Sequence, residues 1–254
     1  MASTDKLSFI VTAGKSNAEE LLGSKATAEG YSTIASGQFS HAEGYYTTAS
    51  GRAAHAEGSN TTASGEYFPH AEGSGTTASG DYSHAEGCNT KASGTCSHAE
   101  GGNYSSAGSV LGDVTIDSYD IPNLSEPITV KGPVAYGIQS HAEGAQTLAY
   151  GYSSHAEGYR TIASGDESHA EGYNTTASGT YSHAEGSGTI ASKRYSHAEG
   201  KSTTASGDAS HAEGKSTMAS GDYSHAEGSG TTASGDYSHA EGSGTIASKR
   251  YSHA

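Results

Sequence analysis

The sequence has few of the side chains that build an ordinary globular core. Its 254 residues include no tryptophan, three phenylalanines and two methionines, and the 32% hydrophobic fraction is mostly alanine and tyrosine. With four prolines, and glycines that do not recur every third residue, a collagen triple helix is excluded. No apolar run approaches roughly 18 residues, so a membrane-spanning helix is excluded. Charged residues make up 16% and the net charge is −15, which disfavours nucleic acid as a partner.

The chain is built from a repeat of 14 residues. All 14 histidines lie in it, and they are 14 residues apart except for one step of 15 at Phe68-Pro69 and one of 43 between His98 and His141. A typical unit reads Ser-His-Ala-Glu-Gly, two variable residues, Thr-x-Ala-Ser and a short turn. Self-similarity at a fixed period is typical of a solenoid, so the chain is predicted to be ordered.

Each unit is better suited to short strands than to a helix. A coiled coil would place two glycines in every unit, at about 1 kcal/mol each, around a seam of alanine. In a strand, side chains alternate between faces, so Ser40 and Ala42 share one face while His41 and Glu43 share the other. We therefore predict flat coils, with small residues inside and glycine turns, that stack as parallel strands at about 4.8 Å per coil.

The pattern Ser-His-Ala-Glu-Gly-x-x-Thr-x-Ala-Ser-Gly resembles the head repeats of YadA-like trimeric autotransporter adhesins. Similar repeats occur in tail-fibre-like proteins of phages and prophages. The resemblance covers residues 26–108 and 134–254. It implies an all-β fold, a left-handed parallel β-roll of 14-residue coils, assembly as a homotrimer and attachment to a surface. Where the better-known adhesin repeats carry aliphatic residues, this chain carries His and Glu.

Four segments are expected. Residues 1–25 form an N-terminal cap or attachment segment with a strand at Leu7–Val11, and residues 26–108 and 134–254 form the β-roll. Residues 109–133 are an inserted hairpin or loop, because Val114–Ile116 and Ile128–Val130 alternate like short strands. The insertion is predicted to contact a receptor or to form a collar that packs on neighbouring subunits. Cys88 and Cys96 are expected to be free thiols.

Stacking in register turns the His and Glu positions into two columns on one face, which we predict to be a structural ladder and a subunit interface. These positions barely vary among units, whereas the position after Thr changes from Lys91 to Ile246. The alternative is that this partly apolar column faces the other subunits and the His/Glu face is solvated. The ladder consists of His41, Glu43, His55, Glu57, His70, Glu72, His84, Glu86, His98, Glu100, His141, Glu143, His155, Glu157, His169, Glu171, His183, Glu185, His197, Glu199, His211, Glu213, His225, Glu227, His239 and Glu241.

The chemistry predicted for this ladder is structural. Glutamates about 5 Å apart repel one another, and a histidine beside each offers a hydrogen bond or a positive charge. We therefore predict that stability or lateral association rises as the pH falls toward about 6. A linear column does not converge on a zinc ion as a tetrahedral site requires, so hydrogen bonding is predicted, with no metal and no cofactor. Many equivalent copies also argue against an active site, and no enzymatic activity is predicted.

Two sets of residues are candidates for contact with a surface receptor or glycan. One is an aromatic column two residues after the second glycine, whose rigid amphipathic rings suit sugar or protein contact, although they also suit covering the edge of the roll. The other lies in the insertion. The candidates are Tyr82, Tyr181, Tyr195, Tyr223, Tyr237 and Tyr251 in the column, which also includes Phe39 and Tyr67, and Tyr119, Ile121 and Leu124 in the insertion.

The sequence therefore predicts a non-enzymatic trimeric fibre segment that attaches to a cell surface or host receptor, on a virion tail or a bacterial cell surface. The Met1 start and the lack of a convincing signal peptide favour a phage or prophage tail fibre over the head of a surface adhesin. The repeat is also compatible with a self-assembling filament or with an ice-binding solenoid. An ice-binding solenoid would use the regular threonine column, but Thr47 belongs with the inward alanines.

Overall fold

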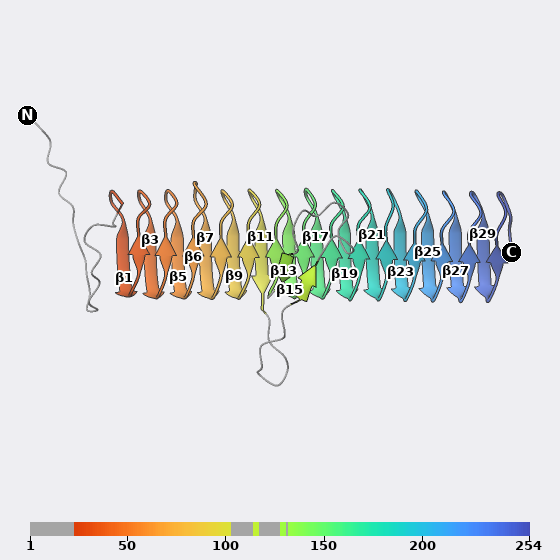
Figure 1. Cartoon of the computed structure of the whole chain (residues 1–254), viewed down its shortest axis with the longest axis horizontal. Helices are drawn as coiled ribbons and strands as arrows, with labels where there is room; N and C mark the ends of the chain where they lie inside the picture. Colours follow the sequence, from red (N-terminus) through yellow and green to blue (C-terminus); the bar gives the residue numbers. More distant parts are fainter. Residues whose placement is uncertain (1–22, 103–113, 117–127, 131) are drawn as a thin grey trace, which may run out of the picture.

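The computed structural model describes residues 23–102, 114–116, 128–130 and 132–254. In these ranges the chain forms a rod of stacked coils, each contributing one long and one short strand (Figure 1). No helix in the described part is long and apolar enough to cross a membrane. The expected strand at Leu7–Val11 and most of the expected N-terminal segment lie outside the described residues.

The two kinds of strand form two separate sheets. The long strands are β1 (Thr27–Tyr31), β3 (His41–Tyr45), β5 (His55–Ser59), β7 (His70–Ser74), β9 (His84–Cys88), β11 (His98–Gly101), β15 (His141–Ala145), β17 (His155–Tyr159), β19 (His169–Tyr173), β21 (His183–Ser187), β23 (His197–Lys201), β25 (His211–Lys215), β27 (His225–Ser229) and β29 (His239–Ser243). The short strands are β2 (Ile34–Ala35), β4 (Thr48–Ala49), β6 (Thr62–Ala63), β8 (Thr77–Ala78), β10 (Lys91–Ala92), β14 (Val134–Ala135), β16 (Leu148–Ala149), β18 (Ile162–Ala163), β20 (Thr176–Ala177), β22 (Ile190–Ala191), β24 (Thr204–Ala205), β26 (Met218–Ala219), β28 (Thr232–Ala233) and β30 (Ile246–Ala247).

Every coil pairs in parallel with the next, and equivalent repeat positions lie opposite one another. His41 pairs with His55 and Glu43 with Glu57, one unit further along the chain. The backbone hydrogen bonds follow the same rule, as in Thr48 N–H to Thr61 O at 2.9 Å. The predicted all-β parallel solenoid of 14-residue coils is confirmed.

The core is a set of columns of small residues. The alanines of both strands, such as Ala42 and Ala49, are completely buried, and so is Thr47. Ser40 is also buried and donates its hydroxyl to Gly37 O at 2.7 Å, which closes the turn before the long strand. The coil is therefore filled by methyl groups and hydroxyls, as the alternation predicts.

The glycine of the long strand allows the coils to approach one another. Gly44 has a φ of 112°, and a Cβ there would lie 2.1 Å from the carbonyl oxygen of Gly58. The second glycine of the unit is less strictly required. Lysine takes its place at positions 193 and 249, and the N–H of Lys193 donates to Ser196 Oγ at 3.2 Å, as that of Gly207 does to Ser210 Oγ at 3.1 Å.

The insertion interrupts a single coil without breaking the stack. β11 pairs with β15 and β10 pairs with β14, so the chain leaves after a long strand and returns at the next short one. Within the insertion, β12 (Val114–Ile116) and β13 (Ile128–Val130) pair antiparallel. The candidate contact residues Tyr119, Ile121 and Leu124 lie outside the described residues.

Candidate functional site

The histidine–glutamate face is formed by the outward side chains of the long strands. Because the alanine between them points into the coil, His41 and Glu43 both point outward, and the same holds in each later coil. From His41 to His239 the imidazole rings of neighbouring coils stack at 4.7–5.0 Å between centroids and within 12° of parallel. The predicted columns are therefore present, although their role as an interface stays a prediction.

In most coils the histidine lies near its own glutamate, but without a hydrogen bond between them. The Nε2 to carboxylate oxygen distances run from 3.5 Å at His183 and Glu185 to 4.0 Å at His155 and Glu157. The Nε2 atoms are shielded from solvent, and those from His41 to His239 have no hydrogen-bond partner. The structural hydrogen bonding predicted from the sequence is thus not made within one chain.

Burial lowers the pKa of several of these histidines. Desolvation is the largest cause, and the charge of a neighbouring histidine lowers the pKa further, while nearby glutamates raise it by less. For the single chain these shifts favour lower stability toward pH 6, the opposite of the sequence-based prediction, and a melting series decides between the two. The lowered pKa values belong to His70, His155, His169, His183, His197 and His211.

The glutamates border an open groove. It runs beside the glycine column, from Glu29 and Gly30 to Glu143 and Gly144. Because these glycines have no side chain, nothing on their side fills the space next to the carboxylates. The negative charge of the ladder is thus accessible along one side of the rod.

The aromatic column forms a second surface, here called the tyrosine edge. It comprises eight aromatic residues in the turn that closes each coil, all with a left-handed φ and all exposed: Phe39, Phe68, Tyr82, Tyr181, Tyr195, Tyr223, Tyr237 and Tyr251. The sequence reasoning was wrong about one member. In the coil with the extra residue, Phe68 takes the column position instead of Tyr67, because the Phe68 N–H bonds to Arg52 O as Tyr82 N–H bonds to Tyr67 O.

Arginines lie over part of the tyrosine edge. Tyr223 and Tyr237 stack at 5.0 Å, and Tyr237 and Tyr251 at 5.2 Å. The guanidinium of Arg250 lies 4.8 Å from the ring centroid of Tyr251, and that of Arg194 lies 5.0 Å from the ring of Tyr195. Cation–π contacts of this kind hold the two basic residues against the aromatic column.

Sequence reasoning missed further aromatic stacks at other repeat positions. Tyr31 and Tyr45 stack at 5.2 Å, and Tyr136 and Tyr150 at 5.1 Å. Each stack joins only two coils, so it does not appear as a long column in the sequence. The available signal was a pair of tyrosines 14 residues apart.

The threonine column does not form a surface. Thr47, Thr61 and their equivalents are buried inside the coils, so this column offers no hydroxyl array to ice. Cys88 and Cys96 are both free thiols, as predicted.

The comparison with protein families gives one result. Five segments match the model of the YadA head domain repeat in two copies, at residues 42–65, 142–168, 156–182, 170–192 and 198–224. They lie on both sides of the insertion and coincide with the stacked coils. No curated protein matches the chain.

Proposed function

Because this chain carries YadA head repeats, we propose that it is a non-enzymatic segment of a homotrimeric, extracellular fibre whose tyrosine edge attaches to a surface receptor or glycan. The YadA head family is adhesin-like, trimeric and surface-exposed, and matched coils lie in both arrays of the rod. The proposal extends these family properties to the present chain and adds the contact surface.

The backbone conformation of the tyrosine edge carries the proposal. Tyr223 has a φ of 55° and is 59% exposed, and the equivalent tyrosines are alike. A side chain in the left-handed region costs roughly 1–2 kcal/mol, so the turn itself would favour glycine or asparagine. At the other turn of the coil, glycine, asparagine and serine are the commonest residues in the left-handed position, as at Gly188 and Asn174, and Tyr46 is the one aromatic there among the described coils. Repeated, strained and exposed tyrosines suit a role in contact better than a role in folding.

The test separates contact from folding by replacing these tyrosines with asparagine. In the full chain, Tyr181→Asn, Tyr223→Asn and Tyr237→Asn together should leave the melting temperature unchanged or higher. Binding to the target surface, read on a glycan array and on whole cells, should fall by about tenfold or more, since buried aromatic anchors dominate contact energies.

The matched control removes two tyrosines elsewhere on the rod. Tyr159→Ser and Tyr173→Ser change a stacked pair at a position that holds serine in other coils, so binding should persist. Equal loss in the control and the test variant, or full binding without the tyrosine edge, would contradict the proposal.

Two carriers are compatible with such a segment. Repeats of this kind occur in tail-fibre-like proteins of phages and prophages, while the matched family favours the head of a cell-surface adhesin. Antibodies against the rod should label virion tails in the first case and intact bacterial surfaces in the second. Labelling of neither would contradict attachment as the role of the segment.

A further inference from the structure

The histidine–glutamate face holds nitrogen atoms that nothing in the chain satisfies. Each Nε2 from His41 to His239 is buried from solvent without a hydrogen-bond partner, beside a carboxylate 3.5–4.0 Å away in most coils. A buried polar atom without a partner is costly and calls for an explanation. A ligand that accepts the lone pairs of several such nitrogens would remove this cost.

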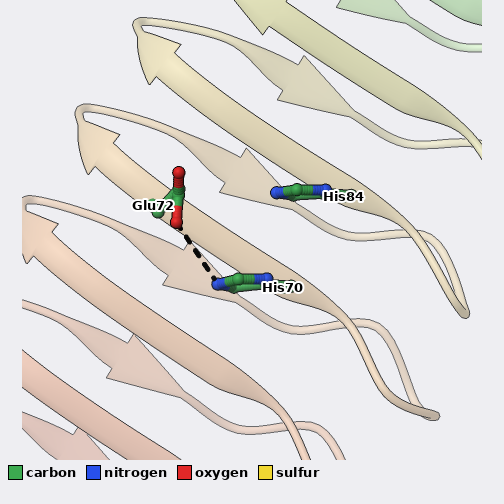
Figure 2. A group of neighbouring side chains, drawn as sticks. All are labelled: His70, Glu72 and His84. Atoms are coloured by element: carbon green, nitrogen blue, oxygen red, sulfur yellow. Dashed lines mark ion pairs between the residues drawn. The ribbon is translucent and has the colours of Figure 1, made fainter.

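The unpartnered nitrogens lie in groups with a carboxylate. Figure 2 shows one group, in which the parallel rings of His70 and His84 point their edges to the same side and Glu72 lies beside them. The Nε2 of His70 and Oε2 of Glu72 are 3.7 Å apart, and the three ligand atoms all lie within 4.8 Å of one another. Three atoms so arranged lie within about 2.8 Å of a common point, and zinc ligand distances of about 2.0–2.1 Å would shorten this by less than an ångström. The rings of His70 and His84 are 4° from parallel, so both must turn toward a shared ion. This departs from the expectation, drawn from the sequence, that the linear column does not converge on an ion.

We propose that the histidine–glutamate face is a repeated binding array for divalent first-row transition-metal ions, each held by two imidazole Nε2 atoms of adjacent coils and one carboxylate oxygen. The same grouping recurs at His141, Glu143 and His155, and at His197, Glu199 and His211. The fourth position would take water or a group of another subunit.

The donor set selects the class of ion. Two imidazoles and a carboxylate suit Zn²⁺, Co²⁺, Ni²⁺ or Cu²⁺, whereas Ca²⁺ and Mg²⁺ prefer sites made of oxygen atoms. Metal binding requires neutral imidazole, so the uptake of ions should weaken as the pH falls. At the group of His70, Glu72 and His84, the open groove beside Glu72 gives an ion a path to the site.

The spacing of the array sets its capacity. His155 belongs to the group with His141 and also to the group with His169, but it has a single Nε2. An ion bound by one group therefore uses the histidine that the next group needs, so only every second group along the rod can hold an ion. The 14 histidines should bind at most about seven ions per chain.

The experiment uses the full chain and Co²⁺ as the probe. Equilibrium dialysis should saturate near about seven ions, with the intense visible absorption of four- or five-coordinate Co²⁺, and added Zn²⁺ should displace the colour. The variant His197→Gln, His211→Gln, His225→Gln and His239→Gln should bind about three ions fewer, because it leaves four pairs of histidines in adjacent coils and an isolated His253. The control Asp166→Asn, Asp208→Asn, Asp222→Asn and Asp236→Asn removes four carboxylates away from the array and should keep the full number of ions.

A second measurement on the unmodified chain guards against a variant that does not fold. Saturating Zn²⁺ should protect the histidines from diethylpyrocarbonate, and Mg²⁺ should not. Pale octahedral Co²⁺, or equal modification with and without Zn²⁺, would overturn the proposal. All three ligands come from one chain, so the outcome does not depend on attachment to a receptor.

Discussion

At the scale of single residues, two glycines of one coil have different tasks. Gly186 has a φ of 108°, and a Cβ there would lie 2.1 Å from the carbonyl oxygen of Gly200. Gly188 has a φ of 67°, but a Cβ there would meet only Ser202 Oγ at 3.8 Å. Gly186 is needed for the contact between coils, and Gly188 only for its backbone angle.

Alanine at these two positions should therefore have unequal effects. Gly186→Ala is expected to lower the free energy of unfolding by about 3 kcal/mol or more, since rigid backbone must move. Gly188→Ala should cost about 1 kcal/mol, the penalty for a left-handed residue. Urea unfolding of both variants measures the difference, and equal losses would show that the close contact between coils does not limit stability.

The histidines give a second residue-scale prediction, on pH. Folding lowers the pKa of six of them, so the folded chain binds protons less readily than the unfolded chain. Their contribution to stability is complete above the ordinary pKa of 6.5 and is lost as the pH falls through the lower folded-state pKa. The melting temperature should thus fall between about pH 7 and about pH 5.

A variant with fewer of these groups provides the control for the melting series. His155→Gln, His169→Gln, His183→Gln and His197→Gln together should make the pH dependence shallower. If the melting temperature instead rose with acid, the positive partner role first predicted for the histidines would be restored.

At the scale of elements, the short strands have an outward position whose exposure varies along the rod. Leu148 of β16 is completely buried, while Ile246 of β30 at the equivalent position is 65% exposed. Val134 of β14 is buried as well. The outer face of the short strands is thus covered in the coils that follow the insertion.

Truncating these two residues tests that difference. Leu148→Ala should cost about 2–5 kcal/mol because it leaves a cavity, and Ile246→Ala should cost less than about 0.5 kcal/mol. Thermal or urea unfolding of each variant measures the loss. Similar small losses in both variants would mean that the burial of the Leu148 side chain adds little stability.

The strands could be predicted from the sequence because the period is constant. Once Ala42 points inward, alternation places His41 and Glu43 outward, and equal spacing places them over His55 and Glu57. Rotamers are not fixed by spacing. A difference of about one ångström between Nε2 and the carboxylate separates a hydrogen bond from an unsatisfied pair, and the sequence does not contain it.

Two irregular features of the coils could not be predicted from the repeat pattern. The extra residue before Phe68 moved the aromatic position by one, because hydrogen bonds between coils decide which residue occupies the turn. Lys193 replaces a glycine and keeps an N–H to serine Oγ bond that Gly207 also makes. Both depend on backbone geometry within a turn, where the repeat gives no constraint.

At the scale of the whole molecule, two faces compete to meet the neighbouring subunits. The histidine–glutamate face repeats with little variation and holds unsatisfied Nε2 atoms that a partner or an ion would satisfy. The outward face of the short strands holds Lys91, Thr204 and Met218 in equivalent positions. Such variation suits a solvated surface, so we predict that the trimer forms through the histidine–glutamate face.

Single tryptophans can decide between the faces, because the chain has no tryptophan of its own. Glu185→Trp places the indole on the predicted interface, and Ile190→Trp places it on the other face of the same coil. In the first variant light scattering should report dissociation, or the emission should shift to the blue as the ring is buried between subunits. In the second variant the trimer should stay intact with the emission of a solvated indole. The reverse pair of results would assign the contact to the short strands, and the histidine–glutamate face, ions included, would then lie on the outside of the fibre.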